Sequence, residues 1–412
     1  MLVLAAVVCL PVSAQRFVGM DLSLLPNYEI HNKPYLDKDG NAIDDMLVWL
    51  PNVGVNTVRA RIFVNPQKKN QKGETDIQVC QNLDYVKAFG ARVKAAGLNF
   101  MLDFHYSDTW ADPVYQLLPA GWAGCVTAEQ KAAKVYEYTK EVLAALIEAG
   151  ATPDFVQVGN EISYGIVGIG VSPYDNPSSD WDGFSKVLEN GCKAVREQCP
   201  AAKIVIHTER SGNLAQTQYF YQHLENLDYD IIGLSYYPFW HGSLDDLEAV
   251  VSMLATEFSE KKVQIVETAY NFNYKPDGMK YDFSSTWPYT EAGQKKFIED
   301  LVAALDKHSN VNGVYYFFPE EAGNGDDSDW SHGGATVLGN WCNRGLWKPE
   351  VSGLGHKCNS GLYSLQNYVA GIADIAAEVR KSQGIFNLSG MKITEPQPGE
   401  IYIQGGKKYL SK

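Results

Sequence analysis

The chain has 412 residues, 45% of them hydrophobic and 20% charged, which is enough to bury one large α/β core or two smaller ones. Its formal net charge of −14 argues against nucleic acid or an anionic membrane surface as a partner. The sequence has no basic patch, no glycine loop suited to phosphate and no apolar run long enough to span a bilayer. We therefore expect no nucleic-acid partner and no integral membrane segment.

The first fourteen residues, MLVLAAVVCLPVSA, have the composition of a signal peptide. They carry no charge and end in Val-Ser-Ala, a small-residue pattern suited to cleavage, although the basic region that usually begins such a peptide is missing. We predict a signal peptide at 1–14 and an exported protein that is extracellular, periplasmic or held at the cell surface. Lipidation of Cys9 stays open.

Six cysteines follow residue 14, and in an oxidising compartment they permit three disulfides. Six cysteines allow fifteen pairings, of which the local pairs Cys192–Cys199 and Cys342–Cys358 are the easiest to close. No cysteine has the spacing from histidine that a zinc site needs, so we expect no zinc site.

Eight short apolar segments have the pattern of buried strands. In chain order they span 16–22, 57–63, 99–104, 155–159, 203–207, 231–235, 262–266 and 313–318. Helical spacing of apolar residues recurs between them, at 44–50, 83–96, 128–149, 181–198, 214–224, 244–258 and 290–309. A segment at 362–369 would supply the last, short helix. This alternation predicts an α/β fold built from βα units.

Polar and aromatic residues follow these strands and hardly ever precede them. The clearest case is HYSDTWADP at 105–113, which comes directly after the third strand and is far too polar for a core. Planar acceptors and aromatic faces in a loop suit a hydroxyl-rich ligand. Because the C-terminal ends of barrel strands meet at one face, the distribution predicts a (β/α)8 TIM barrel with its site there. An open doubly wound sheet would instead gather its site at one switch point.

Glu161 and Glu267 stand out because each follows a buried strand with a carboxylate. A lone glutamate after a strand is most often a solvated loop acid, and an ionised one is costly to bury unpaired. Two of them, at the tips of the fourth and seventh strands, indicate a carboxylate pair for acid/base and nucleophilic chemistry. Arg59 and Arg61 on the second strand share one face, which in a closed barrel would be the lumen.

Together these motifs resemble the family 53 glycoside hydrolases, secreted endo-β-1,4-galactanases, over roughly 17–368. The resemblance rests on GMDLS at 19–23, VRAR at 58–61, HYSDTWADP at 105–113, GNE at 159–161, SYYPF at 235–239 and VET at 266–268. Many barrel glycosidases share GNE, whereas HYSDTWADP combined with SYYPF is specific. The resemblance implies a (β/α)8 fold and a retaining, double-displacement hydrolysis of internal bonds in the galactan or type I arabinogalactan of plant pectin. Separately from the resemblance, we expect a monomer that needs no cofactor; a structural calcium is possible but not supported by the sequence.

The same resemblance assigns roles to individual residues. Glu161 corresponds to the general acid/base and Glu267 to the nucleophile, which Arg59 would keep ionised and Tyr237 would hydrogen-bond. Asn160 would bind the sugar 2-hydroxyl. The full set of implied substrate-binding residues is Arg59, His105, Asp108, Trp110, Asn160, His207, Tyr237, Phe317 and Trp347.

Three stretches depart from the family pattern. The eighth strand ends in FFPEE at 317–321, where the family usually has Trp-Glu-Pro followed by Ala-Trp, so an aromatic face survives at Phe317 without the indole donor. The fifth strand has Glu209 two residues after His207, where the family tends to have Asp. The calcium loop of some bacterial relatives is not matched at 273–282, and the run GNGDDSD at 323–329 is more typical of a solvated turn, so we expect no required metal.

We expect residues 15–369 to form the catalytic domain and 370–412 to be a C-terminal tail of unknown role, a short appendage to the barrel. The tail pattern indicates a helix at 372–381 and two short strands within 385–390 and 401–409. Two other functions remain open. A mannanase or cellulase-like endoglycanase on the same barrel would have no reason to carry HYSDTWADP. A non-catalytic glycan-binding protein would have no need for both glutamates, Arg59 and Tyr237.

Overall fold

The structure is a computed structural model of the full chain. It describes residues 15–31, 34–273, 275, 278–321, 342–349, 355–368, 385–387, 392–393, 401–404 and 407–410. The predicted signal peptide at 1–14, the aspartate-rich run at 323–329 and the predicted helix at 372–381 lie outside the described residues.

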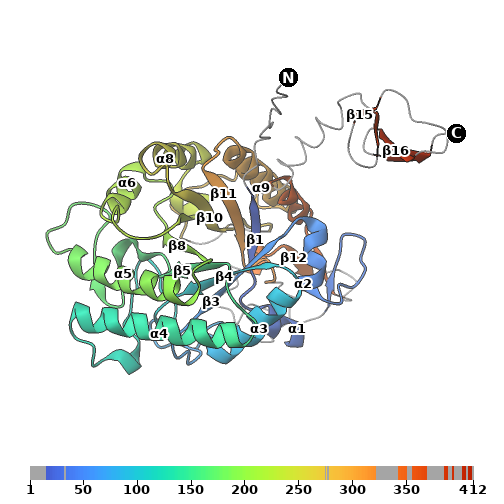
Figure 1. The fold of residues 1–412 in the computed structure, drawn as a ribbon. Coiled ribbons are helices and arrows are strands. Elements are labelled where there is room, and N and C mark those ends of the chain that lie inside the picture. The colour runs from blue at the N-terminus through green and yellow to red at the C-terminus, as the bar shows by residue number, and fades with distance from the viewer. Residues whose placement is uncertain are drawn as a thin grey trace, which may run out of the picture.

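Eight parallel strands close into a barrel, which confirms the predicted (β/α)8 fold (Figure 1). They are β1 (Phe17–Asp21), β3 (Thr57–Ile62), β4 (Asn99–Phe104), β5 (Phe155–Val158), β8 (Lys203–Thr208), β9 (Ile231–Tyr236), β10 (Lys262–Thr268) and β11 (Val311–Phe317). Each pairs with its sequence neighbour in the barrel, and β11 closes the ring on β1 with Phe17 opposite Gly313. Each of the eight strands begins and ends within two residues of its predicted segment.

Helices wind around the outside of the barrel between its strands (Figure 1). The main ones are α3 (Leu83–Ala95), α4 (Ala128–Glu148), α5 (Trp181–Gln198), α6 (Leu214–Gln222), α8 (Leu244–Glu257) and α9 (Glu291–Asp306). Polar side chains at the start of each helix accept a hydrogen bond from its first turn, namely Asn82, Thr127, Asp180, Asn213, Ser243 and Thr290. Such a cap stabilises a helix by about 1 kcal/mol, which explains why the predicted starts hold.

The barrel interior changes from apolar to polar along the strands. Its apolar layer is formed by Phe17, Met101, Phe155, Val205, Ile231, Val266 and Tyr315. Because side chains alternate along a strand, the residues two positions further on share the same inward face. Asp103, Gln157 and His207 are such residues, and all three are buried. The alternation therefore stacks a polar layer on the apolar one, at the C-terminal end of the barrel.

Shorter elements occupy the loops. They are α1 (Leu25–His31), β2 (Tyr35–Leu36), α2 (Met46–Trp49), η1 (Leu50–Val53), η2 (Ala120–Trp122), η3 (Ile162–Tyr164), β6 (Gly165–Ile166), β7 (Ile169–Gly170), α7 (Pro238–His241), η5 (Cys342–Arg344), β12 (Trp347–Pro349), β13 (His356–Cys358) and η6 (Ser360–Ser364). The sequence did not predict the small sheet β12-β13-β2, which joins distant parts of the chain. Most of the predicted helix at 362–369 is replaced by the 3₁₀ turns of η6 and one further helical turn at 366–368.

The tail forms a small antiparallel sheet of its own. It contains β14 (Ile385–Asn387), β15 (Lys392–Ile393), β16 (Ile401–Gln404) and β17 (Lys407–Leu410), where two strands were predicted. Among the described residues, these strands pair only with one another, and Figure 1 draws β15 and β16 apart from the barrel. The independence of the tail from the catalytic domain stays a prediction.

The two local pairs that the sequence marked as easiest to close do not form disulfides, because Cys192, Cys199 and Cys358 are all free thiols. Cys192 lies on α5 and Cys199 is its C-cap, seven residues further on. A helix rises about 1.5 Å per residue, so their Cα atoms are about 10 Å apart, beyond the reach of a disulfide.

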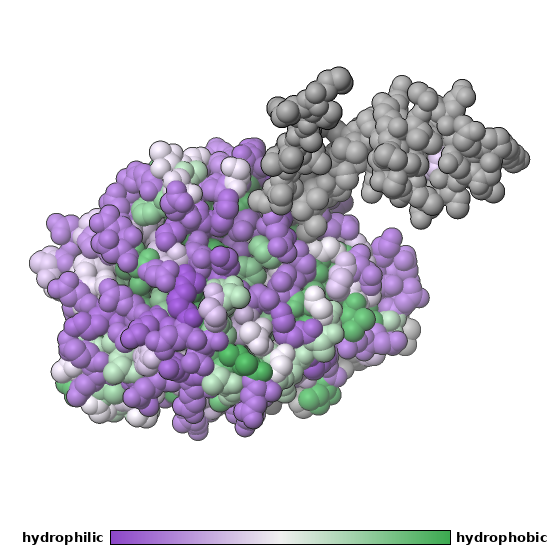
Figure 2. All heavy atoms as spheres, in the orientation of Figure 1, coloured by the Kyte–Doolittle hydropathy of each residue, from purple (hydrophilic) through white to green (hydrophobic). Residues whose placement is uncertain are grey.

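Figure 2 shows hydrophobic residues scattered among hydrophilic ones on the face drawn, and the most exposed large apolar side chains are far apart in the chain: Ile30, Val48, Val114 and Val126. Across the described ranges, every helix is too short or too polar to cross a bilayer.

Candidate active site

A cleft of about 870 Å³ opens at the C-terminal ends of the barrel strands. Residues from the ends or following loops of every barrel strand except β1 line it, which is the face that the sequence predicted. The polar and aromatic lining includes Asp76, His105, Trp110, Asp112, Asn160, Glu161, Glu209, Arg210, Tyr237, Trp240, His241, Glu267, Lys280, Phe317 and Arg344.

Glu161 reaches the cleft through a sharp turn at the end of β5. Gly159 has φ +89° and Glu161 has φ +46°, so the chain leaves the strand in left-handed conformations. A Cβ on residue 159 would lie 2.7 Å from Ile162, so glycine is required there on two counts. The left-handed conformation is uncommon for a glutamate and turns its side chain out of the strand direction. Ser235 then donates a hydrogen bond of 2.6 Å to Oε1 of Glu161.

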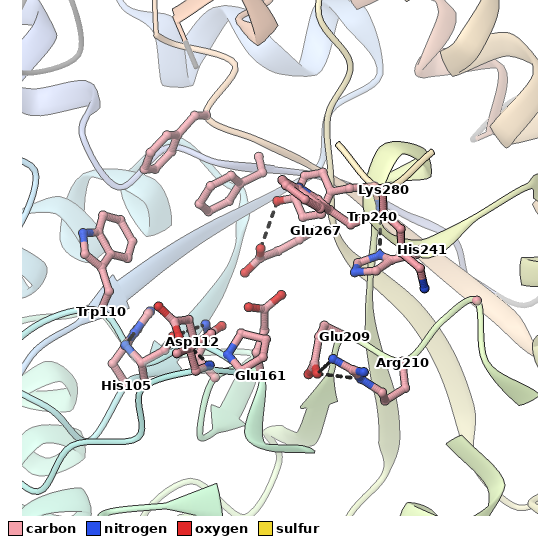
Figure 3. A pocket seen from close by; sticks show the side chains of 18 of the residues that line it. His105, Trp110, Asp112, Glu161, Glu209, Arg210, Trp240, His241, Glu267 and Lys280 are labelled. Carbon is pink, nitrogen blue, oxygen red and sulfur yellow. Dashed lines mark hydrogen bonds and ion pairs between the residues drawn. The ribbon is translucent and has the colours of Figure 1, made fainter. Parts of the chain in front are cut away.

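Glu267 reaches the same cleft because β10 contains an irregularity. The pairing of β10 with β9 shifts between Ile265 and Glu267, which places Glu267 opposite Ser235. Such a bulge re-aims the side chains that follow it. Arg59 Nη2 lies 2.9 Å from Oε1 of Glu267, and the Tyr237 hydroxyl donates to Oε2 at 3.0 Å. Figure 3 shows the carboxyl groups of Glu161 and Glu267 pointing toward one another.

Arg59 is the charged centre beneath the cleft. Its guanidinium is almost completely buried and contacts Asp21 at 2.7 Å and Asp103 at 2.9 Å, in addition to Glu267. Burial alone would lower the pKa of Arg59, but the charges of Asp103 and Glu267 raise it instead. A buried cation with this many anionic partners stays ionised, and it places a permanent positive charge against Glu267.

The two glutamates have different electrostatic surroundings. Burial and the charges of Glu267 and Glu209 raise the pKa of Glu161 well above its ordinary value. Burial also raises the pKa of Glu267, but Arg59 opposes this rise and the Tyr237 hydroxyl also favours the ionised form. When one proton is shared between two nearby carboxyls, it therefore resides on Glu161.

His105 and Trp110 both line the cleft, as the resemblance implied. His105 Nε2 lies 3.2 Å from Asp103, and its Nδ1 accepts a hydrogen bond from the Ala111 backbone at 2.9 Å. The Trp110 indole donates to Asp76 at 2.8 Å, and the Arg61 guanidinium lies 4.3 Å from the centre of its ring. Both rings are thus held in place before any ligand binds.

Four residues expected to bind substrate do not line the cleft: Arg59, Asp108, His207 and Trp347. Asp108 accepts a hydrogen bond from the Ala120 backbone at 2.8 Å, which ties down its loop. His207 is fully buried beneath the site and contacts its residues from below, with Nε2 2.8 Å from the Ser235 hydroxyl and Nδ1 3.0 Å from the Asn160 side-chain oxygen. Trp347 is fully buried against the small sheet, where its indole donates to the Leu36 carbonyl at 3.2 Å. Arg59 also lies beneath the cleft, although it contacts Glu267 directly. Trp341, a second tryptophan close to Trp347 in the sequence, lies outside the described residues.

At the end of β11, the aromatic ring of Phe317 lies in the cleft, whereas the acids Glu320 and Glu321 are buried away from it. Phe317 and Phe318 both line the cleft, and Arg344 stacks over the two rings at 4.9 and 4.8 Å. Glu320 and Glu321 are fully buried: Glu320 accepts from the Leu24 backbone at 3.0 Å, and Glu321 lies 3.3 Å from Arg344. The acids therefore anchor neighbouring loops.

Sequence reasoning missed Trp240 and Arg344 as cleft residues. Trp240 follows SYYPF directly, so the aromatic run after the sixth strand was a usable signal. Arg344 comes from a distant segment and carries no local signal. Within the described ranges, no three His, Cys, Asp or Glu side chains are grouped so that they could hold a metal ion.

Comparisons with known proteins agree on one family. The family model described as "Glycosyl hydrolase family 53" matches residues 17–346. The endo-beta-1,4-galactanase of Bacillus subtilis (strain 168) is 32% identical over 312 residues, covering 73% of this chain and 69% of that protein. Arabinogalactan endo-beta-1,4-galactanase A of Aspergillus niger is 32% identical over 337 residues, covering 77% and 89%. A solved structure of a fungal beta-1,4-galactanase has 29% identity and a TM-score of 0.69, covering 86% of this chain and 99% of that one.

Proposed function

The chain belongs to glycosyl hydrolase family 53, and from that membership we propose that it is an endo-β-1,4-galactanase with a retaining mechanism. The observation that carries the proposal is the pair of carboxyls facing one another in the cleft (Figure 3). Glu161 is the carboxyl whose pKa is raised further, and Glu267 is held by the buried Arg59 and by Tyr237. Retaining enzymes need this division between a proton donor and an ionised nucleophile.

In the first step, Glu267 attacks the anomeric carbon while Glu161 donates its proton to the glycosidic oxygen. The bond between that carbon and oxygen breaks, the leaving sugar departs with the proton, and Glu267 becomes an ester of the remaining sugar. Arg59 and Tyr237 orient the attacking carboxylate, since they contact its two oxygens separately.

In the second step, Glu161 acts as a base. It takes a proton from water, the water oxygen attacks the anomeric carbon, and the ester bond to Glu267 breaks. Two inversions at the same carbon leave the β-configuration intact. Asn160 lines the cleft beside Glu161, which suits it to bind the sugar 2-hydroxyl.

The names of the relatives support β-1,4-galactan as the substrate, because galactanases from a bacterium and a fungus match across most of this chain. The same relatives are named as endo-acting enzymes, which supports cleavage of internal bonds. We also propose that the substrate is the galactan of plant pectin. We propose further that the protein is exported from the cell, is a monomer and needs no metal ion.

The test is to incubate the purified protein with galactan, arabinogalactan, mannan and cellulose and to measure new reducing ends. We expect depolymerisation of galactan, with early products of mixed length. Cleavage of mannan or cellulose in preference to galactan would favour the other endoglycanases. Binding to galactan without cleavage would favour a glycan-binding protein.

NMR of the earliest products should show the β-anomer, and an α-anomer would exclude retention. Chelation by EDTA should leave the rate unchanged.

A further inference from the structure

A short chain of buried hydrogen bonds runs from His207 to the candidate acid Glu161. His207 Nε2 lies 2.8 Å from the Ser235 hydroxyl, and that hydroxyl lies 2.6 Å from Oε1 of Glu161. His207 and Ser235 are both fully buried. A hydroxyl has only one proton, so the direction in which this chain points determines what Oε1 of Glu161 can do.

The direction is set at the far end, by Gln157. Arg59 donates from Nε and Nη2 to one atom of the Gln157 amide, at 3.3 and 3.1 Å. A guanidinium cannot accept a hydrogen bond, so that atom is the amide oxygen. The amide nitrogen of Gln157 is therefore the atom that lies 3.0 Å from His207 Nδ1, and it has protons to donate.

Nδ1 of His207 faces a second donor, the backbone N–H of Glu161 at 3.4 Å. The Asn160 oxygen also lies 3.0 Å from Nδ1, but Arg59 and Gln157 already donate to that oxygen at 3.0 and 3.1 Å. Burial and the charge of Arg59 lower the pKa of His207 well below its usual value, although Asp103 opposes the shift; His105 and His241 lower it further. His207 is thus neutral, Nδ1 is an acceptor, and the one ring proton is on Nε2.

We propose that His207 and Ser235 form a one-way chain that keeps Oε1 of Glu161 a permanent acceptor, so that its catalytic proton is carried by Oε2. Nε2–H of His207 donates to the Ser235 oxygen, and Ser235 has no other group to which it donates among the described residues. Its proton goes to Oε1 whether Glu161 is ionised or not. His207 and Ser235 are positioning residues, and their role rests on the proposed acid/base function of Glu161.

The chain also has an electrostatic consequence. Glu161 is faced by three acids, Glu267 on β10, Glu209 after β8 and Asp112 after β4; burial and these charges raise its pKa. The hydroxyl of Ser235 acts in the opposite sense, since a donor stabilises the ionised form. It thereby eases the return of Glu161 to a base in the second step. If the chain pointed the other way, Glu161 would donate to Ser235, and the bond would stabilise the protonated form instead.

The test is the sign of a pKa change. We expect Ser235→Ala to raise the pKa of Glu161 by about one pH unit, as the loss of one hydrogen bond to a charged group predicts. The readout is ¹³C NMR of protein labelled at the glutamate carboxyl carbon, with Glu161 assigned from Glu161→Gln. The alkaline limb of kcat/KM on galactan should move upward with it. A downward shift, or none, would overturn the proposal.

Ser211→Ala is the matched control, because it removes another buried hydroxyl that bonds the backbone carbonyl of Ser235 and does not touch Glu161. It should leave the pKa of Glu161 unchanged. Ser235→Thr keeps the hydroxyl and should restore the wild-type value. If Ser235→Ala does not fold, Ser235→Cys retains the shape with a weaker donor and should shift the pKa in the same direction. Failure of the wild-type protein to cleave galactan would count against the proposed function and would leave the NMR comparison interpretable.

Discussion

Single residues in the cleft owe their chemistry to their neighbours. Glu161 and Glu267 have the same side chain, but only Glu267 contacts a guanidinium, and Glu161 has acids around it. We expect Glu267→Gln to fold, because Arg59 keeps Asp21 and Asp103 as partners, and to lose turnover by several orders of magnitude, since an amide cannot replace the carboxylate as the nucleophile.

The loss of rate in Glu161→Ala should depend on the leaving group of the substrate. Galactan has a poor leaving group and should lose on the order of 10²–10⁴-fold in kcat, the usual contribution of a general acid. An aryl β-galactobioside with an acidic phenol needs no protonation and should lose far less in the first step. Steady-state rates on both substrates measure this, and equal losses would remove Glu161 from the acid role.

Phe317 lines the cleft although the motif to which it belongs, at 317–321, departs from the family pattern. Its ring is partly buried, stacks on Phe318 at 4.1 Å and contributes to the cleft lining. An aromatic contact of this kind is worth about 1 kcal/mol, so Phe317→Ala should lower kcat/KM on linear β-1,4-galactan about fivefold. Phe317→Trp should be tolerated. If Phe317→Ala equals wild type, Phe317 only packs in the wall and Trp240 becomes the aromatic to test.

At the scale of elements, the barrel and the tail are held together differently. The barrel strands form a closed ring of parallel pairs, whereas β14 to β17 pair only among themselves in the part of the chain that the structure describes. We expect truncation after Gln383 to leave galactan cleavage near wild type. Melting curves would show whether the shortened protein is folded, and a folded but inactive protein would mean that the tail contributes to the site.

For the whole molecule, the buried acids of the cleft couple stability to pH. The pKa of Glu161 is higher in the folded protein than in the unfolded chain, so folding favours its protonated form. This contribution is fully present below the unfolded pKa of about 4.3 and is lost as pH rises through the folded pKa. Glu161→Gln keeps a neutral side chain at every pH and should melt higher than wild type at pH 7, by on the order of 2 °C.

The gain in Tm for Glu161→Gln should shrink as pH falls toward 4, because the wild-type carboxyl is then protonated too. Glu148→Gln, a change on the exposed surface of α4, serves as the control and should show no such trend. A difference between Glu161→Gln and wild type that does not vary with pH would argue against the raised pKa.

The sequence by itself determined the barrel and the face on which its site lies. Strand positions follow from short apolar runs, helix starts from capping side chains, and both are local signals that need no knowledge of the fold. Alternation along a strand placed Asp103 and Gln157 above the apolar layer, since Met101 and Phe155 precede them by two residues. The polar residues after the strands indicated the cleft because the C-terminal ends of barrel strands meet at one face.

Tertiary structure alone decided how the site is completed. Simple alternation would give Val266 and Thr268 the inward face of β10, and a register shift against β9 brings Glu267 to the cleft instead. Trp347 is buried by a sheet whose strands come from opposite ends of the domain, and Arg344 reaches Phe317 from a distant turn. Hydrogen bonds from its two nitrogens to Gln157 and Ser235 hold the His207 ring in place beneath the cleft. Each depends on pairing or packing between segments far apart in the chain, which local patterns do not encode.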